Sequence, residues 1–134
     1  MAKRQMSEEE RRVYDRLTEW AAQLDALLHM YIPDRRLMRR EHRDEGRTLY
    51  RAVKNALGAE HRRFRSRRGE AAQSDAEQRW FQGTVHEAYL HMDASARASA
   101  ETWFDGVVAA RADIALGMSE MREVYDIPKT GADQ

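Results

Sequence analysis

Residues 7–31 read SEEERRVYDRLTEWAAQLDALLHMY, and this segment alone indicates a helical class of fold. Ser7 and Glu10 have the Ser-x-x-Glu spacing of a capping box, in which each side chain accepts a hydrogen bond from the other residue's backbone N–H. Apolar residues then recur at spacings of four and three, the period of one helix face: Val13, Leu17, Trp20, Leu24, Leu27 and Tyr31. We therefore predict an amphipathic helix that ends before Pro33.

The rest of the chain predicts three further helices. The second is expected to start near Arg35, with Asp34 as its cap, and to run at least to Leu57. The third follows another Ser-x-x-Glu box at Ser74, and the fourth begins somewhere in residues 95–99 and closes before a proline. No segment alternates apolar and polar residues at strand spacing. We predict an all-α fold, an antiparallel helical bundle of about four main helices.

The composition predicts one folded domain over residues 1–134, because 42% of the residues are hydrophobic and 34% are charged. We expect flexible tails at about 1–6 and 128–134 and the main loop at about 69–75. The absence of cysteine excludes disulfides and thiolate chemistry. With no signal-peptide pattern and no apolar run of membrane-spanning length, we expect a cytoplasmic protein that does not contact a membrane.

The charges are unevenly distributed although their formal sum is zero. Residues 34–68 contain 13 Lys and Arg against 5 Asp and Glu, whereas residues 69–134 contain 5 against 12. Arginine outnumbers lysine by 20 to 3, which suits bidentate contacts with phosphate or carboxylate and is also typical of GC-rich codon usage. The middle of the chain is therefore basic and its C-terminal half acidic.

Six cations of the expected second helix recur at spacings of three and four, opposite its apolar stripe. On a continuous helix they would form a ridge of roughly 27 Å that neutralises phosphates. Three further arginines extend the series toward Phe64, which could stack on an unpaired base. The alternatives are a solvated face, a face paired with acidic residues of the last two helices or of a second copy, and a docking surface for an acidic protein partner. The predicted binding residues are Arg36, Arg40, Arg43, Arg47, Arg51, Lys54, Arg62, Arg63 and Arg65.

His42 and Glu45 fall on the expected apolar side of the second helix, and Arg111 interrupts that of the fourth. Because buried polar groups need partners, we predict a buried polar cluster of these three side chains that fixes the register of the helices. Glu87 and His91 have a Glu-x-x-x-His spacing, which is not the Glu-x-x-His motif of di-iron bundles. We expect no metal and no cofactor.

Arg79 and His86 loosely resemble the Arg-x4–6-His signature of HEPN-type RNases. The resemblance covers two residues, and Trp80 stands where that family usually has a small polar residue. Arg36 with His42 fits the same loose spacing. The resemblance implies that His86 would act on the ribose hydroxyl or the leaving group and Arg79 on the phosphate, as a remote alternative.

Two sequences echo each other: Trp80-Phe81-Gln82-Gly83-Thr84-Val85 and Trp103-Phe104-Asp105-Gly106-Val107-Val108. We interpret both as bulky core anchors followed by a glycine that permits close helix approach. The alternative interpretation is an old duplication of one helix.

The sequence contains no phosphate-binding glycine loop and no nucleophile motif, so we expect no enzymatic activity. We favour a non-catalytic helical binding protein, a nucleic-acid-associated accessory subunit that contacts phosphate backbone, DNA or RNA, within a larger nucleoprotein assembly. The alternative is a protein–protein interaction module or homo-oligomerising adaptor without nucleic-acid binding, which would use apolar surface such as Tyr14, Leu28, Trp80 and Phe104.

Overall fold

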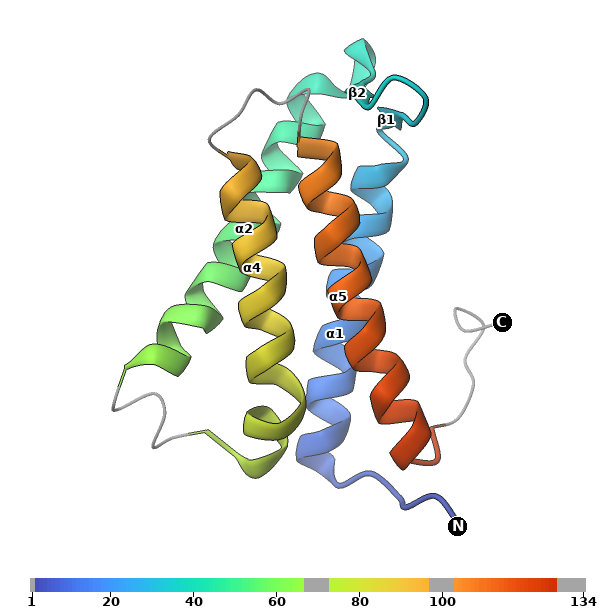
Figure 1. The fold of residues 1–134 in the computed structure, drawn as a ribbon, viewed down its shortest axis with the longest axis vertical. Helices are drawn as coiled ribbons and strands as arrows, with labels where there is room; N and C mark the ends of the chain where they lie inside the picture. The colour runs from blue at the N-terminus through green and yellow to red at the C-terminus, as the bar shows by residue number, and fades with distance from the viewer. Residues whose placement is uncertain (1, 67–72, 97–102, 128–134) are drawn as a thin grey trace.

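The computed structural model describes residues 2–66, 73–96 and 103–127. Four main helices run alternately up and down: α1 (Glu8–Leu28), α2 (Arg43–Arg65), α4 (Gln82–Ala96) and α5 (Trp103–Val124). Figure 1 shows α4 and α5 in front, with α2 and α1 behind them. The helices pair around the bundle as α1 with α5, α5 with α4, and α4 with α2. The predicted all-α bundle is therefore confirmed.

Helix α1 forms as its sequence predicts. The Ser7 hydroxyl accepts a hydrogen bond from the Glu10 N–H at 3.1 Å, and the Glu10 carboxylate accepts one from the Ser7 N–H at 2.7 Å. These bonds satisfy backbone donors that a helix start leaves unpaired. The whole predicted apolar face is buried, with Leu17 and Leu24 fully enclosed. Burial of this stripe, more than intrinsic propensity, stabilises the helix.

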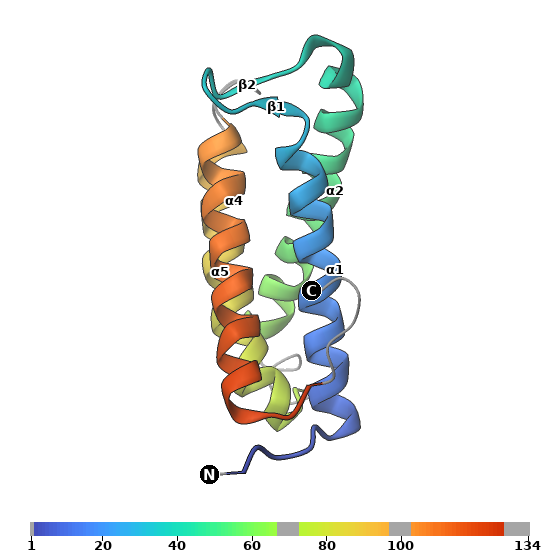
Figure 2. The ribbon, with the colours of Figure 1, turned by 90° about the vertical axis from the view of Figure 1, so that its right-hand side faces the viewer.

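The predicted start of the second helix near Arg35 is wrong. The chain instead forms a short antiparallel hairpin of β1 (Tyr31–Ile32) and β2 (Leu37–Met38), followed by a 3₁₀ turn, η1 (Arg40–His42). Arg36 adopts a left-handed φ of 55°, which reverses the chain after Pro33. Figure 2 shows this hairpin across one end of the bundle. Helix α2 therefore begins eight residues later than expected.

A π-helical turn, η2 (Glu77–Phe81), leads directly into α4. The second predicted capping box is confirmed, since the Ser74 hydroxyl accepts from the Glu77 N–H at 3.2 Å and the Glu77 carboxylate from the Ser74 N–H at 3.4 Å. The wider turn leaves both Trp80 and Phe81 buried. Phe81 stacks on Trp20 of α1 at 5.3 Å between ring centroids.

The boundaries of the remaining segments differ from the predictions. Helix α4 continues through Ser95 and Ala96, where the fourth helix was expected to begin. Residues 2–6 do not all form a free tail, because the Arg4 N–H donates to the Val124 carbonyl at 3.1 Å and the Arg4 carbonyl accepts from Asp126 at 2.8 Å. Most of the predicted loop and the whole predicted tail 128–134 lie outside the described residues.

The two glycines of the echoed sequences have different surroundings. A Cβ at Gly106 of α5 would lie 2.7 Å from Cβ of Ser95 and 2.9 Å from the carbonyl oxygen of His91, both on α4. A Cβ at Gly83 would meet nothing within 4 Å. The interpretation as a close-approach glycine is therefore confirmed at Gly106 and wrong at Gly83.

Candidate nucleic-acid interface

The predicted ridge of six cations on one helix does not exist as a continuous feature. Arg36 lies in the hairpin turn and Arg40 in η1, so neither belongs to α2. The reason is the turn at Pro33, which directs residues 34–42 into the hairpin and η1. The remaining members of the ridge begin with Arg43, the first residue of α2.

Three arginines of α2 form a short column, which we call the arginine column: Arg43, Arg47 and Arg51. All three are exposed. They are four residues apart, which separates their Cα atoms by about 6 Å along the axis and makes the column about 12 Å long. Among the described residues, none of the three has a carboxylate within ion-pair distance. Their charges are therefore available to a ligand.

Several other predicted cations are partly or fully engaged within the chain. Lys54 lies 4.0 Å from Asp93 of α4 and is only 25% exposed. Arg36 lies 3.5 Å from Asp105, and both side chains are so exposed that the pair contributes little.

The strongest of these internal ion pairs belong to Arg63. Its guanidinium donates to Glu60 at 3.0 Å and also to Glu77 of η2, which joins α2 to the turn before α4. Arg62 and Arg65 are exposed at the C-terminal end of α2, and neither has an ion pair with another described residue. Arg63 is therefore a structural residue. Arg62 and Arg65 extend the unpaired positive charge of α2.

The predicted cluster of His42, Glu45 and Arg111 is not formed. His42 and Glu45 are 3.8 Å apart but 38% and 70% exposed, because His42 precedes α2 instead of lying on its apolar face. Arg111 of α5 pairs with Asp25 of α1, donating through Nε at 2.8 Å and through Nη2 at 3.2 Å. This bidentate pair fixes α1 against α5. Arg111 therefore has a structural role, but its partner is Asp25 and not the predicted pair of His42 and Glu45.

Arg79 and His86 are not brought together. The guanidinium of Arg79 lies 4.7 Å from the centre of the Trp80 ring, and it lines a hollow with Glu87 and Asp113. His86 lines a different hollow and contacts His61 of α2. The joint action on a phosphate that the HEPN resemblance implies has no geometric support in this arrangement.

The contact between His61 and His86 was not predicted. Their Nδ1 atoms are 3.2 Å apart, and the ring of buried His61 stacks on Tyr89 at 4.9 Å between centroids. His61 follows Val53 and Leu57 at spacings of four, so the apolar period of α2 contains a signal for its burial. The sequence contains no comparable signal for its partner His86 on α4, because the contact depends on how α2 and α4 pack against each other.

Burial of His61 has a consequence for stability. Desolvation, together with the charges of His86, Arg65 and Arg62, lowers the pKa of His61 below its ordinary 6.5, while Asp93 opposes the shift. The unfolded chain then binds more protons below pH 6.5 than the folded chain does. We expect stability to decrease as pH falls below about 6.5, by at most about 1.4 kcal/mol per pH unit for this group. Urea unfolding at a series of pH values, compared with His61→Gln, would reveal it; identical pH profiles would contradict it.

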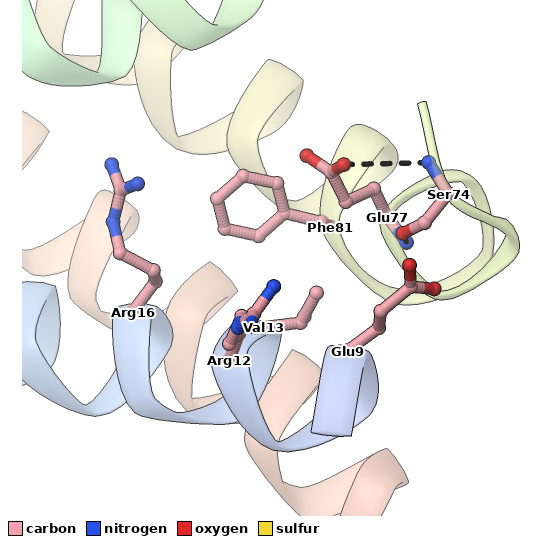
Figure 3. A pocket seen from close by; sticks show the side chains of 7 residues that line it. All are labelled: Glu9, Arg12, Val13, Arg16, Ser74, Glu77 and Phe81. Carbon is pink, nitrogen blue, oxygen red and sulfur yellow. Dashed lines mark hydrogen bonds between the residues drawn. The ribbon is translucent and has the colours of Figure 1, made fainter. Parts of the chain in front are cut away.

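A third hollow, of about 270 Å³, lies between α1 and η2 (Figure 3). Figure 3 shows Arg16 of α1 near Phe81, with Glu77 beside its cap, Ser74. Its main charged groups already have partners: Glu77 binds Arg63, and Arg16 donates to Glu60 at 3.4 Å while covering the Trp20 ring. This arrangement links α1, α2 and η2, and we regard it as structural.

Comparisons with protein-family models, with curated proteins and with solved structures found no match to this chain. No helix in the described part of the chain is long and apolar enough to cross a membrane. The functional conclusion therefore rests on the chemistry of the surface alone.

Proposed function

We propose that this chain is a non-catalytic, nucleic-acid-associated accessory protein of the cytoplasm whose arginine column contacts the phosphate backbone. One observation supports the proposal above all others: Arg43, Arg47 and Arg51 are exposed, aligned and without carboxylate partners in the described residues. Guanidinium groups bind phosphate oxygens through paired N–H donors, which makes a row of them a suitable backbone contact.

The order of the helices supports the same proposal. Helix α2 packs mainly against α4 and α1, whereas α5 packs against the other sides of these two helices. The exposed carboxylates Glu120 and Glu123 of α5 therefore lie diagonally across the bundle from the arginine column. An anionic strand can therefore approach α2 without passing these two carboxylates of α5, and the carboxylate of α4 that lies beside α2, Asp93, is 4.0 Å from Lys54.

The extent of the basic surface suits backbone binding without base readout. The column supplies three contacts, and Arg62 and Arg65 continue the positive charge at the far end of α2. Phe64, which the sequence suggests as a stacking residue, is buried and is not available to a base. We therefore propose contacts with phosphates only, with weak dependence on sequence.

The test is binding of the triple variant Arg43→Gln, Arg47→Gln, Arg51→Gln to labelled single-stranded and duplex DNA and RNA at about 50 mM salt. We expect an affinity about 10- to 100-fold lower than that of the unmodified chain, because three charge-assisted contacts are lost. A matched control, Arg11→Gln, Arg12→Gln, Arg79→Gln, removes the same charge from other exposed positions and should bind nearly normally. Equal weakening of both variants, or no binding by the unmodified chain, would contradict the proposal.

A protein-interaction module is the second candidate, and one observation favours it. The outer face of α5 exposes Val108 at 43% and Leu116 at 60%, with exposed Ala112 between them. Exposed apolar residues in a row are a feature of helix–helix interfaces. Sedimentation analysis of the purified chain, together with the nucleic-acid binding assay, distinguishes the two candidate functions. A stable dimer without nucleic-acid affinity would favour the protein-interaction module.

A further inference from the structure

Two imidazoles from different helices meet at the edge of a hollow of about 560 Å³ between α2 and η2–α4. The Nδ1 atoms of His61 and His86 are 3.2 Å apart, and the ring planes are inclined by 31°. His61 is buried and held by Tyr89, whereas His86 is exposed. One of the two imidazoles is thus fixed by packing, and the other belongs to a solvent-exposed side chain.

The separation of the two nitrogens is close to what a metal ion requires. Bonds of 2.0–2.1 Å from two histidines to a tetrahedral ion place the two nitrogens about 3.3 Å apart. Imidazole nitrogen is a preferred ligand of zinc, nickel and copper ions. The spacing of the two nitrogens therefore already suits a chelate, and the rings must turn so that both Nδ1 lone pairs point at one ion.

The hollow has room and polar groups for the rest of a coordination shell. Gln78 and Gln82 line it, and both carry amide oxygens. Gly83 adds no side chain, and space for one is open at that position. Water molecules can therefore fill the remaining ligand positions, as they do in open metal sites.

We propose that His61 and His86 form a binding site for a divalent transition-metal ion such as zinc, nickel or copper. Water completes the coordination of the ion. The site is distinct from the arginine column and does not depend on the proposed nucleic-acid contact. By joining α2 to α4, a bound ion would brace the helix that carries the column.

Binding requires a tautomer change and no net loss of a proton. Without an ion, one ring donates its Nδ1–H and the other accepts through its Nδ1 lone pair. For both rings to present a lone pair at Nδ1, the donating ring must move its proton to Nε2. Burial and the neighbouring arginines already favour the neutral form of His61 by lowering its pKa.

The affinity should be moderate. Arg65 lines the same hollow and opposes a cation, and within the described ranges no group of three or more His, Cys, Asp or Glu could hold a metal. The site thus has two protein nitrogens and no charged ligand. We expect reversible binding in the manner of an open site, without the tight coordination of a closed four-ligand structural site.

The test is calorimetric titration of the untagged chain with zinc, nickel or copper chloride, with thermal unfolding in parallel. We expect one ion per chain and a melting temperature at least about 5 °C higher at saturation. His86→Gln alters the exposed ligand and should weaken binding at least tenfold. His91→Gln, a change on the same helix at a histidine that pairs with Asp113 at 2.6 Å, is the matched control and should bind normally.

Circular dichroism of both variants would check that their helices are intact. Absence of binding at millimolar metal would overturn the proposal, as would unchanged binding by His86→Gln or equal loss in His91→Gln. Loss of metal binding leaves the nucleic-acid assay interpretable, because neither histidine belongs to the arginine column.

Discussion

Gly106→Leu is expected to lower the free energy of unfolding by about 3 kcal/mol, the upper end of the usual cost of overpacking. At this position α4 and α5 approach so closely that even a methyl group would contact Ser95 and the backbone carbonyl of His91. A backbone atom cannot turn aside as a flexible side chain can, so the larger leucine must separate the two helices. For a domain of marginal stability, this loss removes a large part of the total. Urea unfolding followed by circular dichroism measures it.

Gly83→Leu is the matched control, because Gly83 occupies the corresponding position in the echoed sequence. A side chain there meets open space, and leucine forms helix better than glycine. We expect unchanged stability or a gain of about 0.5–1 kcal/mol. Similar losses in both variants would show that the helices do not approach as described.

Leu24→Ala is expected to cost about 3–5 kcal/mol. Leu24 is completely buried on the face of α1 that packs into the bundle, so truncation removes apolar contact and leaves a cavity. Leu116→Ala, at a position that is 60% exposed, should change stability by less than about 0.5 kcal/mol. The difference between the two midpoints in urea is the measurement, and equal midpoints would contradict the assignment of the buried face.

The helices could be predicted because their signals are local. The capping boxes at Ser7 and Ser74 and the apolar period from Val13 to Tyr31 involve residues within a few turns of one another. The hairpin could not be predicted, because strands of two residues are too short to show an alternating pattern. The sequence after Pro33 is equally compatible with a helix cap, and only the left-handed turn at Arg36 distinguishes the two.

The helix that carries the candidate site was predicted, but the full set of residues in that site was not. Arg43 and Arg47 lie on an exposed helix as expected, whereas Arg36 and Arg40 were misplaced by the boundary error. The same error placed His42 on an apolar face that it does not share. Contacts such as His61 with His86 depend on how α2 and α4 meet, and one helix's period contains no information about the other.

If the arginine column binds phosphate, the affinity of the chain for nucleic acid must fall as salt rises. Three phosphate contacts correspond to a slope of log K against log salt of about −2 for a single strand and about −2.7 for a duplex. We expect a slope at least this steep for the unmodified chain, and a slope shallower by about 2 to 2.7 for Arg43→Gln, Arg47→Gln, Arg51→Gln where residual binding can be measured. The same slope in both proteins, or no binding by the unmodified chain at low salt, would show that the arginine column does not bind phosphate.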